Sequence, residues 1–241
     1  MAYSLITFGT DRGINVDVTG LTVTIPAAAA PGDLFVIAVA TFGSWASTGL
    51  LKTGGAFLSN IRREFLSSLG GTDYAGDFYY GTIPNCAERG ATVLLKARSS
   101  VAVTEMALIW ALFANVDSLN ASGTNQAEDT SAPFGTTLTT TAPATIADGL
   151  VLDTWIRFDN NIVISGYSTG TEIAQVTTEG LTVSSARDAQ IALTYFTGSG
   201  SDAARTASAT AASSPADITI SAAYNVGTVP RYPCGWRLGS V

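Results

Sequence analysis

The sequence of 241 residues contains no histidine and only two cysteines and two methionines. Without histidine, neither a Ser-His-Asp nor a Cys-His nucleophile system can be assembled. Two cysteines with no histidine are also too few for a zinc site or a disulfide framework. The glycine-rich stretches lack the Lys-Ser/Thr ending of a phosphate-binding loop. We therefore predict a protein that is not an enzyme and that binds no metal and no cofactor.

Charged residues are also scarce, at 13% of the chain, whereas an ordinary soluble domain has about 25%. The formal net charge is −7, and no basic cluster is larger than Arg62-Arg63. Because Lys and Arg drive nucleic-acid binding by neutralising phosphates, we expect no nucleic-acid partner. A surface poor in charge suits a chain that neighbouring proteins cover. The alternative is a glycine-rich β-protein of ordinary solubility.

Long hydrophobic runs are missing as well. The longest apolar stretch, "MALIWALFANV" at 106–116, is well short of the ~20 residues that a membrane-spanning helix needs. The N-terminus "MAYSLITFGTDRG" has no basic region followed by an apolar core, so it does not read as a secretory signal. We expect no membrane span and synthesis in the cytoplasm.

The two cysteines, Cys86 and Cys234, are expected to be small buried apolar residues in a protein made in a reducing compartment. A bridge between them is the alternative, and it would tie the tail of the chain to its middle. Nothing in the sequence shows that the two cysteines approach each other.

Short segments with alternating or β-branched residues occur throughout the chain, separated by Gly, Pro, Asp and Asn clusters such as Pro31-Gly32-Asp33 and Asp148-Gly149. This regular spacing predicts an all-β fold: a single β-sandwich of jelly-roll or double Greek-key type over residues 1–226. At most one short helix is expected, at 58–71, where Ile61, Phe65 and Leu69 follow a four-residue spacing before a glycine stop.

One phrase of the sequence occurs twice. "TIPAAAAPGDLFVIAVATFG" at 24–43 and "TTTAPATIADGLVLDTWIRF" at 139–158 share a threonine-bearing strand end, a proline, an alanine-containing connector, a Gly/Asp turn and an apolar strand. The echo indicates that equivalent strands recur in the second half, as in a double Greek key or jelly roll. The apolar strands are too continuous to face water on either side. The residues expected in the core are Leu34, Val36, Ala38, Leu150 and Leu152.

Two polar groupings offer weak alternatives. Asp73 and Asp77 form a pair of carboxylates of the kind that glycosidases use, and we interpret them as solvated turn and strand-edge acids. The turn Asp159-Asn160-Asn161 offers oxygen ligands for calcium, but it lacks the carboxylate density of a dedicated site.

Carbohydrate binding is the main rival among binding functions, because exposed aromatic rings can stack on sugars. The candidates are Trp45, Tyr79, Tyr80 and Tyr167. Core packing is the competing explanation, since amphipathic aromatic residues usually bury their rings.

The C-terminal stretch "NVGTVPRYPCGWRLGSV" at 225–241 differs in composition from the rest of the chain. Its prolines impede strand pairing, and it brings arginines and large aromatic rings, the residue types that dominate binding hot spots. We predict that residues 227–241 form an arm that docks on a neighbouring subunit or particle; the alternative is a last strand of the chain's own sandwich. The predicted partner-binding residues are Arg231, Tyr232, Trp236 and Arg237.

The order of several phrases resembles β-sandwich domains of structural proteins from tailed bacteriophages. The phrases are "GLTVTIPAAAAPGDLFVIAVATFG", "DFYYGTIP", "MALIWALFANVDSLNASG", "TLTTTAPATIADGLVLDTW" and "DAQIALTYFTGSG" ahead of "DITISAAYNV". The resemblance runs over residues 18–226.

This resemblance implies a component of a virion, synthesised in the host cytoplasm. It implies a non-enzymatic head decoration, or a tail or neck accessory, whose partners are other virion proteins and copies of itself. The alternative is a fibre or tail-tip module that adheres to the host and binds a surface glycan.

Overall fold

The computed structural model describes residues 2–14, 20–44, 50–66, 72–97, 104–129, 136–140, 147–158, 163–179, 181, 188–200, 203–210, 217–227 and 234. Within these ranges the regular elements are strands and one short 3₁₀-helix, which confirms the predicted all-β, sandwich-type fold. In chain order the elements are β1 (Ser4–Ile14), β2 (Leu21–Thr24), β3 (Leu34–Ser44), β4 (Leu50–Thr53), β5 (Ser59–Leu66), β6 (Thr72–Thr82), the 3₁₀-helix η1 (Cys86–Glu88), β7 (Thr92–Ala97), β8 (Thr104–Ala114), β9 (Val116–Asp129), β10 (Thr137–Thr140), β11 (Leu150–Phe158), β12 (Ile164–Ser165), β13 (Thr171–Thr177), β14 (Ala189–Thr197), β15 (Arg205–Ala209) and β16 (Asp217–Val226).

The two halves of the chain have the same topology. Strands β1 to β8 form a five-stranded sheet in the order β1-β8-β3-β6-β5 and a three-stranded sheet in the order β2-β7-β4. Strands β9 to β16 repeat both orders, as β9-β16-β11-β14-β13 and β10-β15-β12. Eight antiparallel strands in two sheets with this interleaved order form a jelly roll. We call β1–β8 the first jelly roll and β9–β16 the second.

The repeated phrase in the sequence marks equivalent strands of the two jelly rolls. Residues 24–43 run from the end of β2 through β3, and residues 139–158 run from the end of β10 through β11. In both copies the Gly/Asp turn places one residue at positive φ, Gly32 at 89° and Asp148 at 62°. The predicted recurrence of strands in the second half is therefore confirmed.

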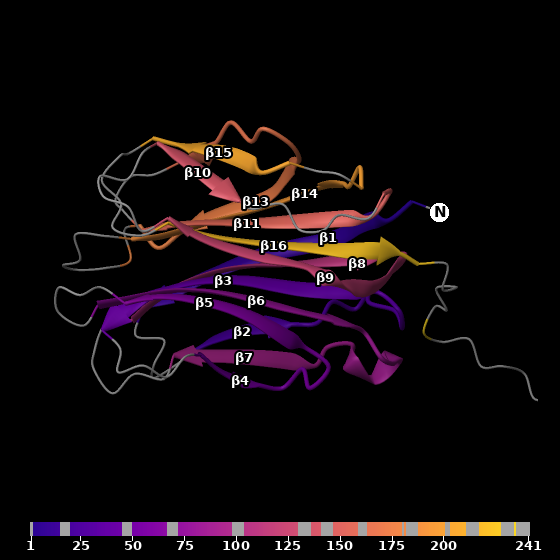
Figure 1. The fold of residues 1–241 in the computed structure, drawn as a ribbon. Coiled ribbons are helices and arrows are strands. Elements are labelled where there is room, and N and C mark those ends of the chain that lie inside the picture. Colours follow the sequence, from indigo (N-terminus) through magenta and orange to yellow (C-terminus); the bar gives the residue numbers. More distant parts are fainter. Residues whose placement is uncertain are drawn as a thin grey trace, which may run out of the picture.

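The four sheets are stacked as layers (Figure 1), with the two five-stranded sheets in the middle and a three-stranded sheet on each outer side. The largest hydrophobic cluster lies between the five-stranded sheets and takes side chains from both jelly rolls. A second cluster fills the first jelly roll, and a smaller third cluster lies inside the second. The central core therefore joins the two jelly rolls into one packed body.

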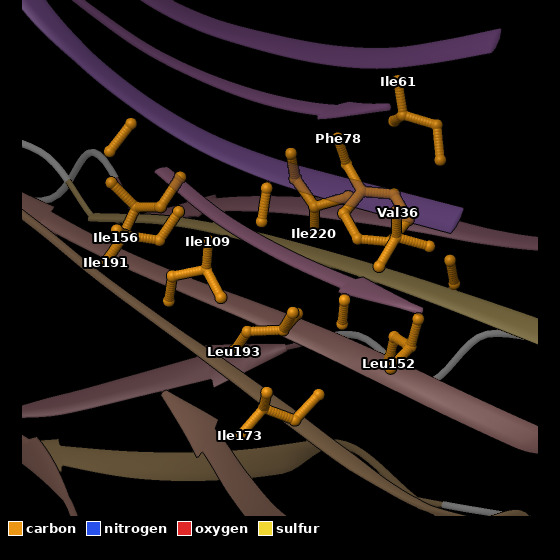
Figure 2. Close-up of a cluster of buried hydrophobic side chains, with 14 of the residues drawn as sticks. Val36, Ile61, Phe78, Ile109, Leu152, Ile156, Ile173, Ile191, Leu193 and Ile220 are labelled. Atoms are coloured by element: carbon orange, nitrogen blue, oxygen red, sulfur yellow. The ribbon is translucent and has the colours of Figure 1, made fainter. Parts of the chain in front are cut away.

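Figure 2 shows this central core, with Val36, Phe78 and Ile109 from the first jelly roll and Leu152 and Ile220 among those from the second. The two faces approach closely at Gly76, where an added Cβ would lie 2.8 Å from the Ile156 side chain. All five residues that were predicted to be in the core are at most 3% exposed, which confirms that prediction: Leu34, Val36, Ala38, Leu150 and Leu152.

The helix expected at 58–71 is wrong. Residues Ser59–Leu66 form β5, which pairs antiparallel with β6, and residues 67–71 lie outside the described ranges. A four-residue spacing such as Ile61 and Phe65 puts both side chains on one face of a helix, but it does the same on a strand of period two. Ile61 faces the central core from this edge strand. Pairing with β6 together with burial in this core therefore favours the strand over the helix.

Strand β16 ends at Val226, and Gly227 is held by a backbone hydrogen bond of 2.9 Å from its N–H to Asn115 O. The division into a domain at 1–226 and an arm at 227–241 stays a prediction. Among the residues that the structure describes, no helix is long and apolar enough to cross a membrane.

Candidate functional site

The C-terminal segment holds the residues predicted to bind a partner, and they lie outside the described part of the chain: Arg231, Tyr232, Trp236 and Arg237. Between them the structure places Cys234, which forms a disulfide with Cys86 over a sequence separation of 148 residues. Cys86 is exposed and Cys234 is half-buried, with its Sγ 4.0 Å from Ala29 O. The expectation of two free, buried cysteines is therefore wrong, because the fold brings Cys234 beside the β6–β7 connection.

The disulfide lies on a platform that we define as the β2–β3 connection (residues 25–33) together with the β6–β7 connection (residues 83–91). Arg89 Nε donates a hydrogen bond of 2.5 Å to Ala29 O. Ile83 N donates to Asp33 O at 2.8 Å, and Gly32 N donates to Ile83 O at 2.9 Å. These bonds join the two connections independently of the cysteines, so the platform is a fixed surface at one end of the first jelly roll.

A pocket of about 320 Å³ lies at the end of the molecule where the N-terminus is found (Figure 1). The residues that line it are Ala2, Tyr3, Asp148, Thr197 and Val226. Tyr3 and Thr197 share a hydroxyl hydrogen bond of 2.9 Å, and burial raises the pKa of the Tyr3 phenol. The ionisable side chains in the lining that the structure describes are Asp148, on a turn, and Tyr3, which is engaged with Thr197.

A buried ion pair spans the interior of the second jelly roll. Arg205 on β15 donates from Nε and Nη2 to the two carboxylate oxygens of Asp153 on β11, at 2.6 and 2.7 Å. Ser221 on β16 donates to the same carboxylate at 2.5 Å and accepts from the guanidinium at 2.7 Å. The guanidinium also lies 4.9 Å from the centre of the Phe196 ring. Both charged side chains are at most 3% exposed, so the pair links the outer sheet to the inner one away from the protein surface.

The first jelly roll has apolar residues at the equivalent positions. Ile37 opposes Trp110 in the first jelly roll, whereas Asp153 opposes Ser221 in the second. A large apolar cluster fills the interior of the first jelly roll. The interior of the second jelly roll combines a small apolar cluster with hydrogen-bonded polar side chains. Because a buried ion pair loses hydration as it forms, it fixes a geometry more than it adds stability. We therefore interpret the polar interior as structural.

Sequence reasoning missed this network, although a signal was present. Asp153 and Arg157 interrupt the otherwise apolar strand "LVLDTWIRF" at positions that share one face. A charge inside such a strand predicts a buried partner. Arg157 indeed lies beside Asp217 of β16, with Nε 3.5 Å from Oδ1 and both side chains at most 2% exposed.

A cluster of carboxylates lies at the seam between the two jelly rolls. Glu105 on β8 accepts a hydrogen bond from the hydroxyl of Thr178, which follows β13. Arg12 on β1 donates to two carbonyl oxygens of the same segment, at 2.7 and 3.2 Å. Asp188, which precedes β14, is 5% exposed. Burial, and then the negative charges of Glu105 and Glu179, raise the pKa of Asp188 to about 6. The seam therefore holds a carboxyl group that binds a proton more tightly than an ordinary aspartate does.

Of the two carboxylates considered as an alternative, the structure describes the side chain of Asp77. Asp77 is fully buried and accepts a hydrogen bond of 2.8 Å from Asn60 Nδ2, so the interpretation of Asp77 as solvated is wrong. The side chain of Asp73 and the turn at 159–161 are outside what the structure describes. In the described residues, no group of three or more Asp, Glu, Cys or His side chains is arranged to hold a metal ion.

The aromatic residues considered for sugar stacking are largely used in packing. Tyr79 is 2% exposed and belongs to the core of the first jelly roll, and Tyr80 packs against the central core. Tyr167 is half-buried, with its ring 6.1 Å from that of Trp155 and its hydroxyl bonded within the chain. Trp45 lies outside the described ranges. Packing accounts for the three rings that are described.

No family model, no curated protein and no solved structure matches the chain.

Proposed function

We propose that the chain is a non-enzymatic structural or accessory protein of a tailed-bacteriophage virion, either a head decoration or a tail or neck accessory. In this role it docks on other virion proteins and on copies of itself. The observation that carries the proposal is a stack of four sheets, joined through one shared core, in a chain with only 13% charged residues. The order of sequence phrases that resembles phage β-sandwich proteins adds the virion context.

The use of charged residues inside the protein supports a surface that neighbours cover. Two ion pairs, four of the few charged side chains, are buried within the second jelly roll. Large apolar side chains are meanwhile exposed, with Phe8 at 47%, Leu51 at 40% and Val163 at 53%. Exposed apolar area is tolerated best where a partner covers it. This balance suits a subunit of an assembly.

The arm at 227–241 is the proposed docking element, because its arginines and aromatic rings are typical of binding hot spots. Cys234 of this arm is bonded to Cys86, so the arm is attached to the platform of the first jelly roll at that residue. An element held at a fixed place loses less entropy on binding than a free tail.

The test is to separate heads from tails of purified particles and to identify this chain by mass spectrometry in each fraction. In reconstitution, a Tyr232→Ala/Trp236→Ala variant should lose incorporation while its unfolding temperature is unchanged. Thr137→Ser changes an exposed polar side chain on β10 of the opposite outer sheet and serves as the matched control. Absence from both particle fractions would refute the proposal.

Host adhesion through a surface glycan is the alternative function. The described aromatic residues favour packing over stacking, so it ranks second. Saturable binding of the purified protein on a glycan array, with no incorporation into heads or tails, would establish adhesion in place of the structural role.

A further inference from the structure

Strand β1 forms an edge of the five-stranded sheet of the first jelly roll, and among the described strands it pairs with β8 alone. The N–H of Arg12 donates a hydrogen bond of 2.8 Å to Asp11 Oδ1, on the side away from β8. Backbone groups alternate between the two sides of a strand, so those of Phe8 and Thr10 point the same way. The register from β6 through β3 to β8 gives the same assignment. The N–H and C=O groups of Phe8 and Thr10 are therefore directed out of the sheet, where a further strand can pair.

The middle of this edge carries a large aromatic ring on each face. Phe8 is 47% exposed on the face toward the second jelly roll, since it pairs with Ala111 of the central core. On the other face the half-buried ring of Trp110 lies over Gly9, where an added Cβ would be 2.6 Å from the ring. A strand that pairs with β1 would cover both rings, which removes exposed apolar area from water.

The charges of β1 leave this middle stretch open to pairing. The edge strand at the other side of the sheet, β5, carries three consecutive charged residues at 62–64, and charges on an edge strand oppose pairing with another chain. In β1 the charges are confined to residues 11–12, and the irregularity of the ladder lies at residues 5–7. Residues 7–10 between them are uncharged and regularly paired on their inner side.

We propose that β1 pairs antiparallel with β1 of a second copy of this chain, about a two-fold axis at Gly9. Phe8 and Thr10 of each copy then exchange backbone hydrogen bonds with Thr10 and Phe8 of the other. The five-stranded sheet of each copy continues into that of its partner. The proposal specifies the contact between copies in the proposed function, and it rests on that function for its place in a particle.

The surroundings of Gly9 favour a second copy as the partner. Because the Trp110 ring covers Gly9, the residue opposite Gly9 on the same face must be small. Gly9 of a second copy meets this requirement, and a glycine inside a strand often marks the close approach of another backbone. The two-fold axis then brings the Trp110 rings of both copies together over the paired glycines.

The same arrangement keeps like charges apart. With Gly9 opposite Gly9, Asp11 of one copy lies opposite Thr7 of the other. The two Asp11 residues are then four positions apart along the strands, roughly 13 Å, which exceeds the Debye length of about 8 Å at physiological salt. An axis normal to the sheets also brings the β13 edges of the two copies toward each other, because β13 lies beside β1, where Arg12 donates to Thr177 O.

Sedimentation equilibrium of the full chain tests the pairing, and the expected species is a dimer. Phe8→Lys should weaken the dimer at least about tenfold, the effect of losing one aromatic contact at an interface and adding a charge to the edge. Thr10→Pro removes an outward N–H without removing a bond to β8 and should weaken the dimer as well. Thr137→Lys adds the same charge to an exposed strand residue of the opposite outer sheet and should leave the dimer unchanged. Circular dichroism checks that each variant is folded.

Hydrogen exchange measured by NMR locates the contact. The Thr10 amide should exchange at least about tenfold more slowly in the wild-type dimer than in the monomeric Phe8→Lys variant, while the Gly9 amide, which bonds to β8, should exchange slowly in both. A wild-type protein that stays monomeric, a dimer that both variants leave intact, or a dimer whose Thr10 amide exchanges freely would each overturn the pairing. A β1-paired dimer that is absent from heads and tails refutes only the proposed function, and a monomer found in either fraction refutes only the pairing.

Discussion

Replacing both cysteines by serine gives a quantitative test of how the tail is held. The disulfide closes a loop of 148 residues in the unfolded chain. The chain-entropy relation for a loop of this length gives about 5 kcal/mol of stabilisation through the unfolded state. This value applies in full if the tail keeps its place in the folded protein without the bond.

The folded state changes the expected value if the bond alone holds the tail. The folded protein must then also close a loop, of the seven residue-to-residue steps from Gly227 to Cys234. The same relation gives about 2 kcal/mol for closing a loop of this length. The difference, about 3 kcal/mol, is the loss of unfolding free energy expected for Cys86→Ser/Cys234→Ser if the bond alone holds Cys234 in place.

Urea denaturation of the wild type and the double variant, followed by tryptophan fluorescence and circular dichroism, measures this loss. Ala87→Ser is the control for a change at the same turn and should stay within about 0.5 kcal/mol of the wild type. A loss near 5 kcal/mol would show that Cys234 keeps its place without the bond and would refute this reasoning. A loss near zero would show that the bond does not constrain the unfolded chain at all.

Three further predictions concern the interior. Val36→Asp places an unpaired carboxylate in the central core, at a cost of several kcal/mol against a total stability of about 5–15, so soluble expression with cooperative unfolding would contradict the fold. Arg205→Met should cost about 3–5 kcal/mol in urea denaturation because it leaves Asp153 buried without its cation, and adding Asp153→Ile should recover most of this loss; a double variant as unstable as the single one would contradict the pairing. The folded-state pKa of Asp188, about 6, lies above its ordinary value of 3.8, so the folded protein binds this proton more tightly and the contribution is lost as pH rises through 6. Asp188→Asn should remove that dependence between pH 4 and pH 7 and raise the unfolding free energy at pH 8 by at most about 3 kcal/mol; an unchanged pH profile would contradict it.

The strand pattern and the repeated phrase were enough to predict the sandwich and the recurrence of strands, because turn residues and apolar runs act locally. The apolar strand that begins at Leu34 and the one that begins at Leu150 both lie in the core, as their unbroken hydrophobicity predicts. The prediction of a helix at 58–71 was wrong because the spacing of Ile61 and Phe65 fits a helix and a strand equally. Pairing with β6, a tertiary interaction, decided the outcome.

The candidate site depended on interactions that no local pattern contains. Cys86 and Cys234 meet only because two jelly rolls are folded between and around them. Expected synthesis in a reducing compartment favoured two free cysteines, and the structure shows a disulfide instead. The partner of Asp153 could be expected to exist, since a charge in an apolar strand needs one, but its identity as Arg205 follows from how the outer sheet crosses the inner one.

The junction between the two jelly rolls has a consequence for how the protein is made. Strand β8 ends at Ala114 and β9 begins at Val116, so Asn115 alone, at φ 60°, connects them. A ribosome that adds about 5–20 residues per second needs roughly 6–22 s for the stretch from Asn115 to Val226. During that time the sheet bearing Val36 and Ile109 has emerged, while the sheet that covers it is still being synthesised. Each nascent chain therefore carries an uncovered apolar face for many seconds, which makes it a substrate for holding chaperones and a hazard when several ribosomes translate one message.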